Sequence, residues 1–333
     1  MKVRYLSAFV VAFVASKAVA QDLATPKCPG GPPLSAAQIA QDACQQAFDV
    51  YQFMAPQLGL ALTGGNATAG QGGVLGGLGH FSVGVRVNGF HGKLPDVNNP
   101  AFTPRVTGAQ PSRTLPTTSQ WVGLPTADAA IGLFKGFPLG VSNVLGLDAL
   151  VSISYVPTLS KDDFSVTPSS NFQFGYGARI GLLSESIVTP GVSFTWIQRD
   201  LPTTDLIANI SGASLSVTDT KVSTKAWRVV ASKNLIVFSV AGGIGQDKYE
   251  QSAVVRGTVS QGGVGLTAQA PGTDESLSRV NFFGDLAYNL PMLKIVGEIG
   301  HATGGTVQTY NSFSGGRGDQ SYTYGSLGLR LTY

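Results

Sequence analysis

The sequence has little charge and no long apolar run beyond its start. Of its 333 residues only 12% are Asp, Glu, Lys or Arg, about half the share in an average soluble domain. A soluble protein with so little charge would need a very large core, yet the apolar share of 43% is ordinary. After the first twenty residues no apolar run approaches the roughly 20 residues of a membrane-spanning helix, which excludes a helical membrane protein.

Glycine and strand-forming residues are abundant instead. Of the 333 residues 43 are glycine, which is nearly twice the usual share of about 7%. Aromatic and β-branched residues run through its whole length, which argues against disorder. The composition therefore predicts a β-rich protein whose apolar residues are spaced out singly.

The first twenty residues have the pattern of an export signal. Lys2 and Arg4 precede a short apolar stretch at 8–15, and Ala18-Val19-Ala20 supplies small residues for cleavage. We therefore predict a cleaved signal peptide at 1–20 and an exported mature chain, in which disulfides can form.

The two cysteines, Cys28 and Cys44, lie close to the predicted mature N-terminus. Neither has a second ligand at the spacing of a metal site, so we predict a disulfide between them and no metal. Apolar residues then recur at three- and four-residue steps, which predicts an amphipathic helix over 35–54. This disulfide-stapled segment, 21–78, is either a small periplasmic cap or a plug docked in or under a barrel.

From residue 79 onward the dominant pattern is strict alternation of apolar and other residues. In the first such segment Phe81, Val83, Val85 and Val87 alternate with polar residues and glycine. Most of the segments run ten residues or more, the length with which a tilted strand crosses a bilayer. Ten segments have this pattern: 79–90, 127–137, 145–157, 171–184, 187–199, 222–232, 235–248, 276–290, 292–302 and 319–333.

The connections between these segments alternate between long and short. Outer-membrane barrels have short periplasmic turns and longer extracellular loops, so ten strands that start in the periplasm place both chain ends on the periplasmic side. The sequence therefore predicts an all-β fold, a transmembrane antiparallel β-barrel of about ten strands over 79–333. A hairpin hidden in 91–126 or 249–275, or a strand at 56–63, would raise the count to twelve or fourteen, and the full range considered is 8–14.

With these features the chain resembles bacterial outer-membrane β-barrel proteins. Such proteins end in an alternating strand with a terminal aromatic residue that their assembly machinery recognises, and here the pattern is Leu327, Leu329, Leu331 and Tyr333. The resemblance implies a location in the bacterial outer membrane, contact with its lipid and an interaction with the barrel assembly machinery. Residues 21–78 also resemble, without a specific motif, the luminal hatch of outer-membrane fatty-acid and hydrocarbon transporters.

No constellation of residues predicts catalysis. His80, His91 and His301 show no spacing that would bring Ser or carboxylates to them. We therefore predict that the chain is not an enzyme and has no catalytic residues, cofactor or metal. A net charge of +3 without a basic run also argues against nucleic-acid binding.

The inward-facing parity of the predicted strands carries most of the charge, and it is the candidate lumen. Seven basic and four acidic residues either form ion pairs that fill a narrow barrel or line a passage for a solute. The first hypothesis for function is a channel or transporter for small or hydrophobic solutes, plugged or gated by the N-terminal segment. The alternative is a non-conducting surface barrel with a structural or adhesive role through its long loops. The candidate lumen-lining residues are Arg86, Asp128, Asp148, Arg179, Arg199, Arg228, Arg279, Asp285, Lys294, Glu298 and Arg330.

Overall fold

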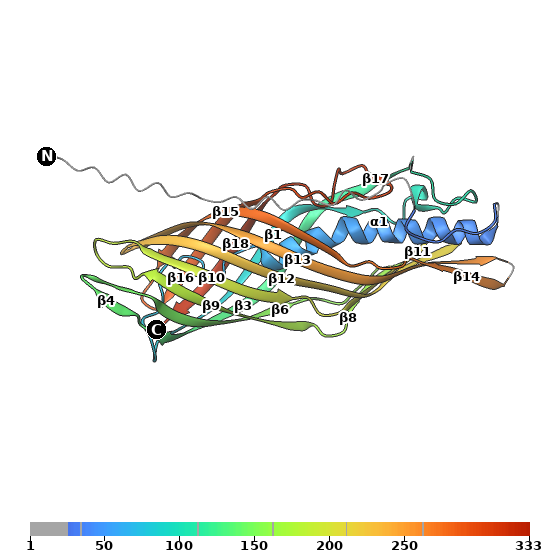
Figure 1. The fold of residues 1–333 in the computed structure, drawn as a ribbon. Coiled ribbons are helices and arrows are strands. Elements are labelled where there is room, and N and C mark those ends of the chain that lie inside the picture. The colour runs from blue at the N-terminus through green and yellow to red at the C-terminus, as the bar shows by residue number, and fades with distance from the viewer. Residues whose placement is uncertain (1–25, 34, 112, 162, 211, 262) are drawn as a thin grey trace.

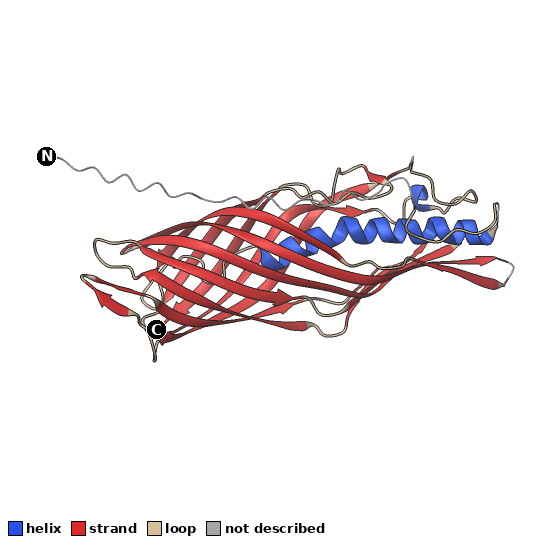
Figure 2. Cartoon of the chain, viewed as in Figure 1, coloured by secondary structure: helices blue, strands red, loops and turns tan. Residues whose placement is uncertain are grey.

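A computed structural model describes residues 26–33, 35–111, 113–161, 163–210, 212–261 and 263–333. The expected signal peptide at 1–20 lies outside them. Ten antiparallel strands form a closed ring, as the alternation predicts (Figures 1 and 2). In chain order they are β1 (Phe81–Pro95), β3 (Thr117–Phe134), β6 (Gly146–Tyr155), β9 (Phe172–Leu183), β10 (Gly191–Asp200), β12 (Ala213–Leu235), β13 (Phe238–Gln261), β15 (Glu275–Asn289), β16 (Leu293–Ala302) and β18 (Tyr322–Thr332).

The ring closes where the first barrel strand meets the last. β1 pairs with β3 on one side and with β18 on the other, where Val85 lies opposite Leu329. The other pairings join strands that follow one another along the chain, including β12 with β13. Closure leaves the ring without a free strand edge, a requirement for strands that cross a bilayer.

The barrel wall is apolar outside and polar inside, the reverse of a soluble protein. On β18 Leu327 is 66% exposed on the outer face, whereas Arg330 is buried inside. Aromatic pairs lie at the two ends of the wall. Phe81 stacks on Tyr333 near the short turns, and Tyr155 packs on Phe172 across β6 and β9 at the other end. Two aromatic belts of this kind mark the boundaries of a bilayer.

Two strands continue far beyond the wall. β12 has 23 residues and β13 has 24, about twice the 9–11 that a bilayer requires. Their extensions carry four short flanking strands. The predicted loop 249–275 is therefore largely strand, but its hairpin does not raise the barrel count because β14 pairs only with β13. The flanking strands are β7 (Leu159–Lys161), β8 (Phe164–Pro168), β11 (Thr204–Ile210) and β14 (Val264–Gln269).

The long connections contain short elements of their own. Loop 91–126 is shorter than expected because β1 and β3 reach into it from both sides. The remaining elements are a 3-10 helix, η1 (Pro100–Phe102), the parallel pair β2 (Thr114–Leu115) and β17 (Ser312–Phe313), and the hairpin β4 (Phe137–Leu139) and β5 (Ser142–Val144).

The N-terminal helix α1 (Ala36–Thr63) has 28 residues, longer than the predicted 35–54, and it continues through Pro56. The region 56–63 is thus helix rather than an additional strand. The sequence pattern ends early because the last two turns lie inside the barrel, where neighbours on all sides remove the one-sided apolar stripe. There Leu60 and Leu62 are buried in a cluster with Phe90 of β1.

The other half of α1 lies at the end of the barrel that carries the strand extensions (Figure 1). It approaches β13 so closely that a side chain at Gly257 would lie 2.1 Å from the backbone nitrogen of Cys44. Tyr333 lies at the short-turn end, as expected, but the described start of the chain does not. Residues 26–33 lie beside this outer half of the helix, because the chain between α1 and β1 runs through the barrel.

Candidate functional site

The barrel interior holds a ladder of buried ion pairs. Arg179 and Asp148 are completely buried and 2.6 Å apart. Asp128 is shared by Arg86 at 2.6 Å and Arg199 at 3.3 Å. Buried charges need such partners because the loss of their hydration is otherwise uncompensated.

The chain that links α1 to β1 runs through this interior as an irregular segment, and we call residues 63–75 the luminal segment. Four wall arginines donate hydrogen bonds to its backbone carbonyls. Arg228 binds the carbonyl of Thr63 at 2.7 Å and Arg86 binds that of Gly64 at 2.8 Å. Arg330 binds the carbonyl of Ala67, and Arg179 binds that of Gln71 at 3.2 Å.

Acceptors on the wall bind the backbone N–H groups of the same segment. Glu298 accepts from Asn66 at 2.9 Å, and Asp285 accepts from Gly70 at 2.8 Å. Ser232 accepts from Gly72 at 2.7 Å, and Asp148 accepts from Leu75 at 3.2 Å. The wall groups come from seven of the ten strands: β1, β6, β9, β12, β15, β16 and β18.

Glycine allows this close fit at specific positions. A side chain at Gly72 would lie 2.6 Å from the backbone nitrogen of Ser232, and Gly65 adopts a φ of +79° beside Arg86. The glycine-rich sequence here is therefore required by the closeness of the wall. The contact between the wall and the luminal segment could not be predicted from the sequence, because hydrogen bonds to a backbone leave no pattern in the side chains.

Cavities along the segment are small. One of about 20 Å³ lies among Arg86, Asp128, Glu298 and Arg330, which is enough for about one water molecule. The unpartnered buried N–H groups of Arg86 and Arg330 and a Glu298 oxygen are polar partners for such a water. A second cavity of about 30 Å³ is apolar and lies between α1 and the strand extensions.

At the outer end two buried carboxylates of α1 bind the surrounding loops. Asp49 accepts N–H donors from Tyr310 at 2.9 Å and from the backbone and side chain of Asn311 at 3.0 and 2.8 Å. Asp42 accepts from the backbone of Arg105 at 2.7 Å and pairs with Arg113 at 3.3 Å. Burial raises the pKa of Asp49 to about 7, although its hydrogen bonds oppose the shift.

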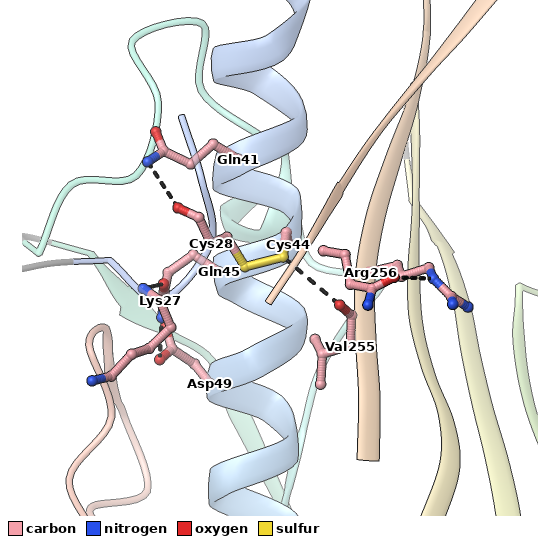
Figure 3. Close-up of a disulfide and its surroundings, with 9 residues drawn as sticks. Lys27, Cys28, Gln41, Cys44, Gln45, Asp49, Val255 and Arg256 are labelled. Atoms are coloured by element: carbon pink, nitrogen blue, oxygen red, sulfur yellow. Dashed lines mark hydrogen bonds between the residues drawn. A yellow bond between two sulfur atoms is a disulfide. The ribbon is translucent and has the colours of Figure 1, made fainter. Parts of the chain in front are cut away.

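The predicted disulfide between Cys28 and Cys44 is present (Figure 3). It ties the chain before the helix to the third turn of α1, on the side that faces Val255 of β13. On the other side of this staple, Gln45 accepts from the backbone N–H of Lys27 at 2.6 Å. The staple therefore holds the outer end of the helix against the strand extension.

The structure buries ten of the eleven candidate lumen residues, and Lys294 is half-buried. Arg279 donates to the carbonyl of Gln320 at 3.0 Å instead of binding the luminal segment. Asp247, which is buried and lies 3.2 Å from Arg228, is absent from the predicted lumen residues. Asp247 shares the inward parity of Ser239 and Ala241, so continuing that alternation by six residues would have found it.

The three histidines are not brought together with carboxylates in the described part of the chain. The ring of His91 packs on Trp121, and His301 lies 3.2 Å from the hydroxyl of Thr323. No cluster of three or more potential metal ligands occurs among the described residues. Within the same residues, no helix has both the length and the apolar character to cross a membrane.

A closed ring with an apolar outer wall and a charged, buried interior decides the class of protein. The chain has the fold of an outer-membrane β-barrel protein. Such a barrel is stable only where lipid covers its wall, and the protein is accordingly placed in the bacterial outer membrane.

Comparison with known proteins finds distant likenesses to solved structures. No family model and no curated sequence matches the chain. Neisserial surface protein A is 8% identical over 77% of this chain and 97% of its own, with a TM-score of 0.28. The translocator domain of autotransporter NalP from Neisseria meningitidis is 10% identical over 76% and 86%, with a TM-score of 0.38. The Pseudomonas putida toluene transporter TodX is 11% identical over 76% and 88%, with a TM-score of 0.32. None of these likenesses transfers a function to this outer-membrane barrel.

Proposed function

We propose that this protein is a plugged, non-conducting outer-membrane barrel that displays its N-terminal helix at the cell surface. The observation that carries the proposal is the luminal segment, whose backbone is bound by wall groups from seven strands. A passage for solute would need these charges to face water, and here they face the chain itself.

The displayed part is the outer half of α1 with the strand extensions around it. Its apolar core includes Phe48, Phe53 and Val255, and the disulfide and the two buried carboxylates hold it together. Rigid, stapled structure at the far end of long strands suits a structural or adhesive role better than it suits a solute path.

A second candidate is a channel for small or hydrophobic solutes that opens when the luminal segment moves. It is favoured by the nature of the contacts, since eight hydrogen bonds hold the backbone of the segment, and Ala67 and Ala69 pack into small apolar clusters on the wall. Movement of the segment would therefore expose polar groups that water can solvate.

Single-channel recording of the refolded full-length protein in planar bilayers separates the two. The wild-type protein should be silent, and Arg86→Gln, which weakens the bonds to Asp128 and Gly64, should give intermittent openings. Arg256→Gln, at a half-buried position on the β13 extension outside the lumen, serves as the matched control. Steady openings of the wild type would contradict the closed barrel and favour the channel.

We also infer that the strand ending in Leu327, Leu329, Leu331 and Tyr333 is the assembly signal. The three leucines and Tyr333 are exposed on the outer wall, where a partner can reach them.

A further inference from the structure

The short turns at one end of the barrel have apolar tips. Ile187 in the connection between β9 and β10 is 95% exposed, and Ile236 between β12 and β13 is 89% exposed. Val141 in the β4–β5 hairpin and Met292 between β15 and β16 are also strongly exposed. Turns in contact with water usually carry Gly, Asn, Asp or Ser.

The backbone of these turns makes the choice of apolar residues more unusual. Ile236 has a φ of +71° and Leu145 a φ of +58°, in the left-handed region that favours glycine or asparagine. A β-branched residue there is a true outlier. Three of the four non-glycine positive-φ residues in the described chain belong to these short connections: Leu145, Ile236 and Met292. If the tips lay in water, glycine or asparagine at these positions would remove both the backbone strain and the exposed apolar surface.

The width of the apolar wall shows where the bilayer ends. On β13 the outward-facing apolar residues run from Phe238 only to Ile244, after which Gln246 and Lys248 are polar. Residues 238–244 number seven, whereas a spanning strand needs about 9–11. On β13 the apolar band reaches that length only if it includes the turn at Ile236.

The neighbouring polar groups fit the same placement. Lys233, near the end of β12, donates to the carbonyls of Ser186 at 2.6 Å and Ile187 at 2.9 Å. Asn289 donates to the carbonyl of Ile236 at 3.0 Å. Turn carbonyls that are bonded inside the protein need less water than free carbonyls.

We propose that the short turns are immersed in the inner leaflet of the outer membrane, with their apolar tips at the boundary between phospholipid headgroups and acyl chains. The tips continue the lipid-facing wall without a polar break, so lipid is the partner that fits them. The bilayer is then positioned toward this end of the barrel, and the extensions of β12 and β13 stand entirely outside it.

The test uses the full-length protein in phosphatidylcholine nanodiscs, where both faces are accessible. A single cysteine at Ile236 or Ile187 is labelled with an environment-sensitive fluorophore, and Gly265→Cys in β14 is the control, since no atom lies within 4 Å of that position. We expect blue-shifted emission at both turns, strong quenching by lipids spin-labelled near the headgroup, and weak quenching by aqueous iodide. The control should show the opposite order.

Emission at the turns like that of the control, with strong iodide quenching, would overturn the proposal. Protection from both iodide and spin-labelled lipid would also overturn it, because it would mean that protein covers the tips. The second turn keeps the test decisive if the Ile236 variant does not fold.

Discussion

Each buried charge of the lumen depends on a specific partner. Arg179 and Asp148 have no exposed surface, whereas Lys225 and Glu250 on the outer face of the extension are a comparable pair that is about 40% exposed. A buried charge without its partner is much more costly than an exposed one.

We therefore expect Asp148→Ala to lower the free energy of unfolding by about 3–5 kcal/mol, since Arg179 is left buried and unpaired. Glu250→Gln should change it by less than about 1 kcal/mol. Urea unfolding in lipid, followed by tryptophan fluorescence, measures both. Equal effects of the two variants would mean that water reaches Arg179.

Asp49 makes the outer structure sensitive to pH. Burial raises the pKa of Asp49 to about 7 from its ordinary value of 3.8. At a pH between these two values the folded state therefore keeps a proton that the unfolded state has released. The free energy of unfolding should fall as pH rises from about 4 to 7, by at most about 1.4 kcal/mol per pH unit. Hydrogen exchange of α1 against pH measures this, and Asp49→Asn should reduce the slope.

Among the elements, the sequence predicts those whose side chains make the contacts, and it does not predict those held through their backbone. All ten barrel strands were predictable because one face of each meets lipid. The end of α1 was not, since Leu60 and Leu62 lie inside the barrel where the helix is covered on every side. The path of residues 63–75 was not predictable either, because the wall binds their backbone.

The luminal segment offers a matched pair of adjacent glycines. A methyl group at Gly72 would lie 2.6 Å from the backbone of Ser232, whereas one at Gly73 would meet its nearest atom at an ordinary 3.6 Å. Gly72→Ala should displace the segment and speed hydrogen exchange at residues 66–75, and Gly73→Ala should not. Equal exchange in the two variants would contradict the close approach at Gly72.

The disulfide joins the chain before α1 to α1 itself, so we expect it to stabilise the outer half of the helix rather than the barrel wall. Replacing Cys28 and Cys44 by serine should destabilise the outer half of α1 by about 3 kcal/mol, the loop-entropy value for so short a loop. Limited proteolysis should then cut residues 26–35 first. The barrel should keep its resistance to denaturation in detergent, and its loss would show that the staple supports the whole fold.

For the whole molecule, the two described ends lie on opposite sides of the barrel. Tyr333 bonds to the start of β1 near the short turns, and the disulfide of Cys28 and Cys44 lies beside the β13 extension at the other end of the barrel. This arrangement differs from the sequence-based expectation that both chain ends lie at the short-turn end of the barrel.

An epitope inserted between Pro32 and Pro33, both exposed, should therefore bind antibody on intact cells. The same epitope at Gly140, in the β4–β5 hairpin, should bind only after the cells are opened. Binding at Gly140 alone on intact cells would reverse the orientation.

The pairing of β1 with β18 also sets an order of events during assembly. β18 follows the other nine ring strands along the chain, so its seam with β1 cannot form until all ten strands have been made. The luminal segment is synthesised before every barrel strand, and its binding partners lie on strands from both sides of that seam. The full set of contacts between the wall and the luminal segment is therefore complete only when β1 and β18 have paired.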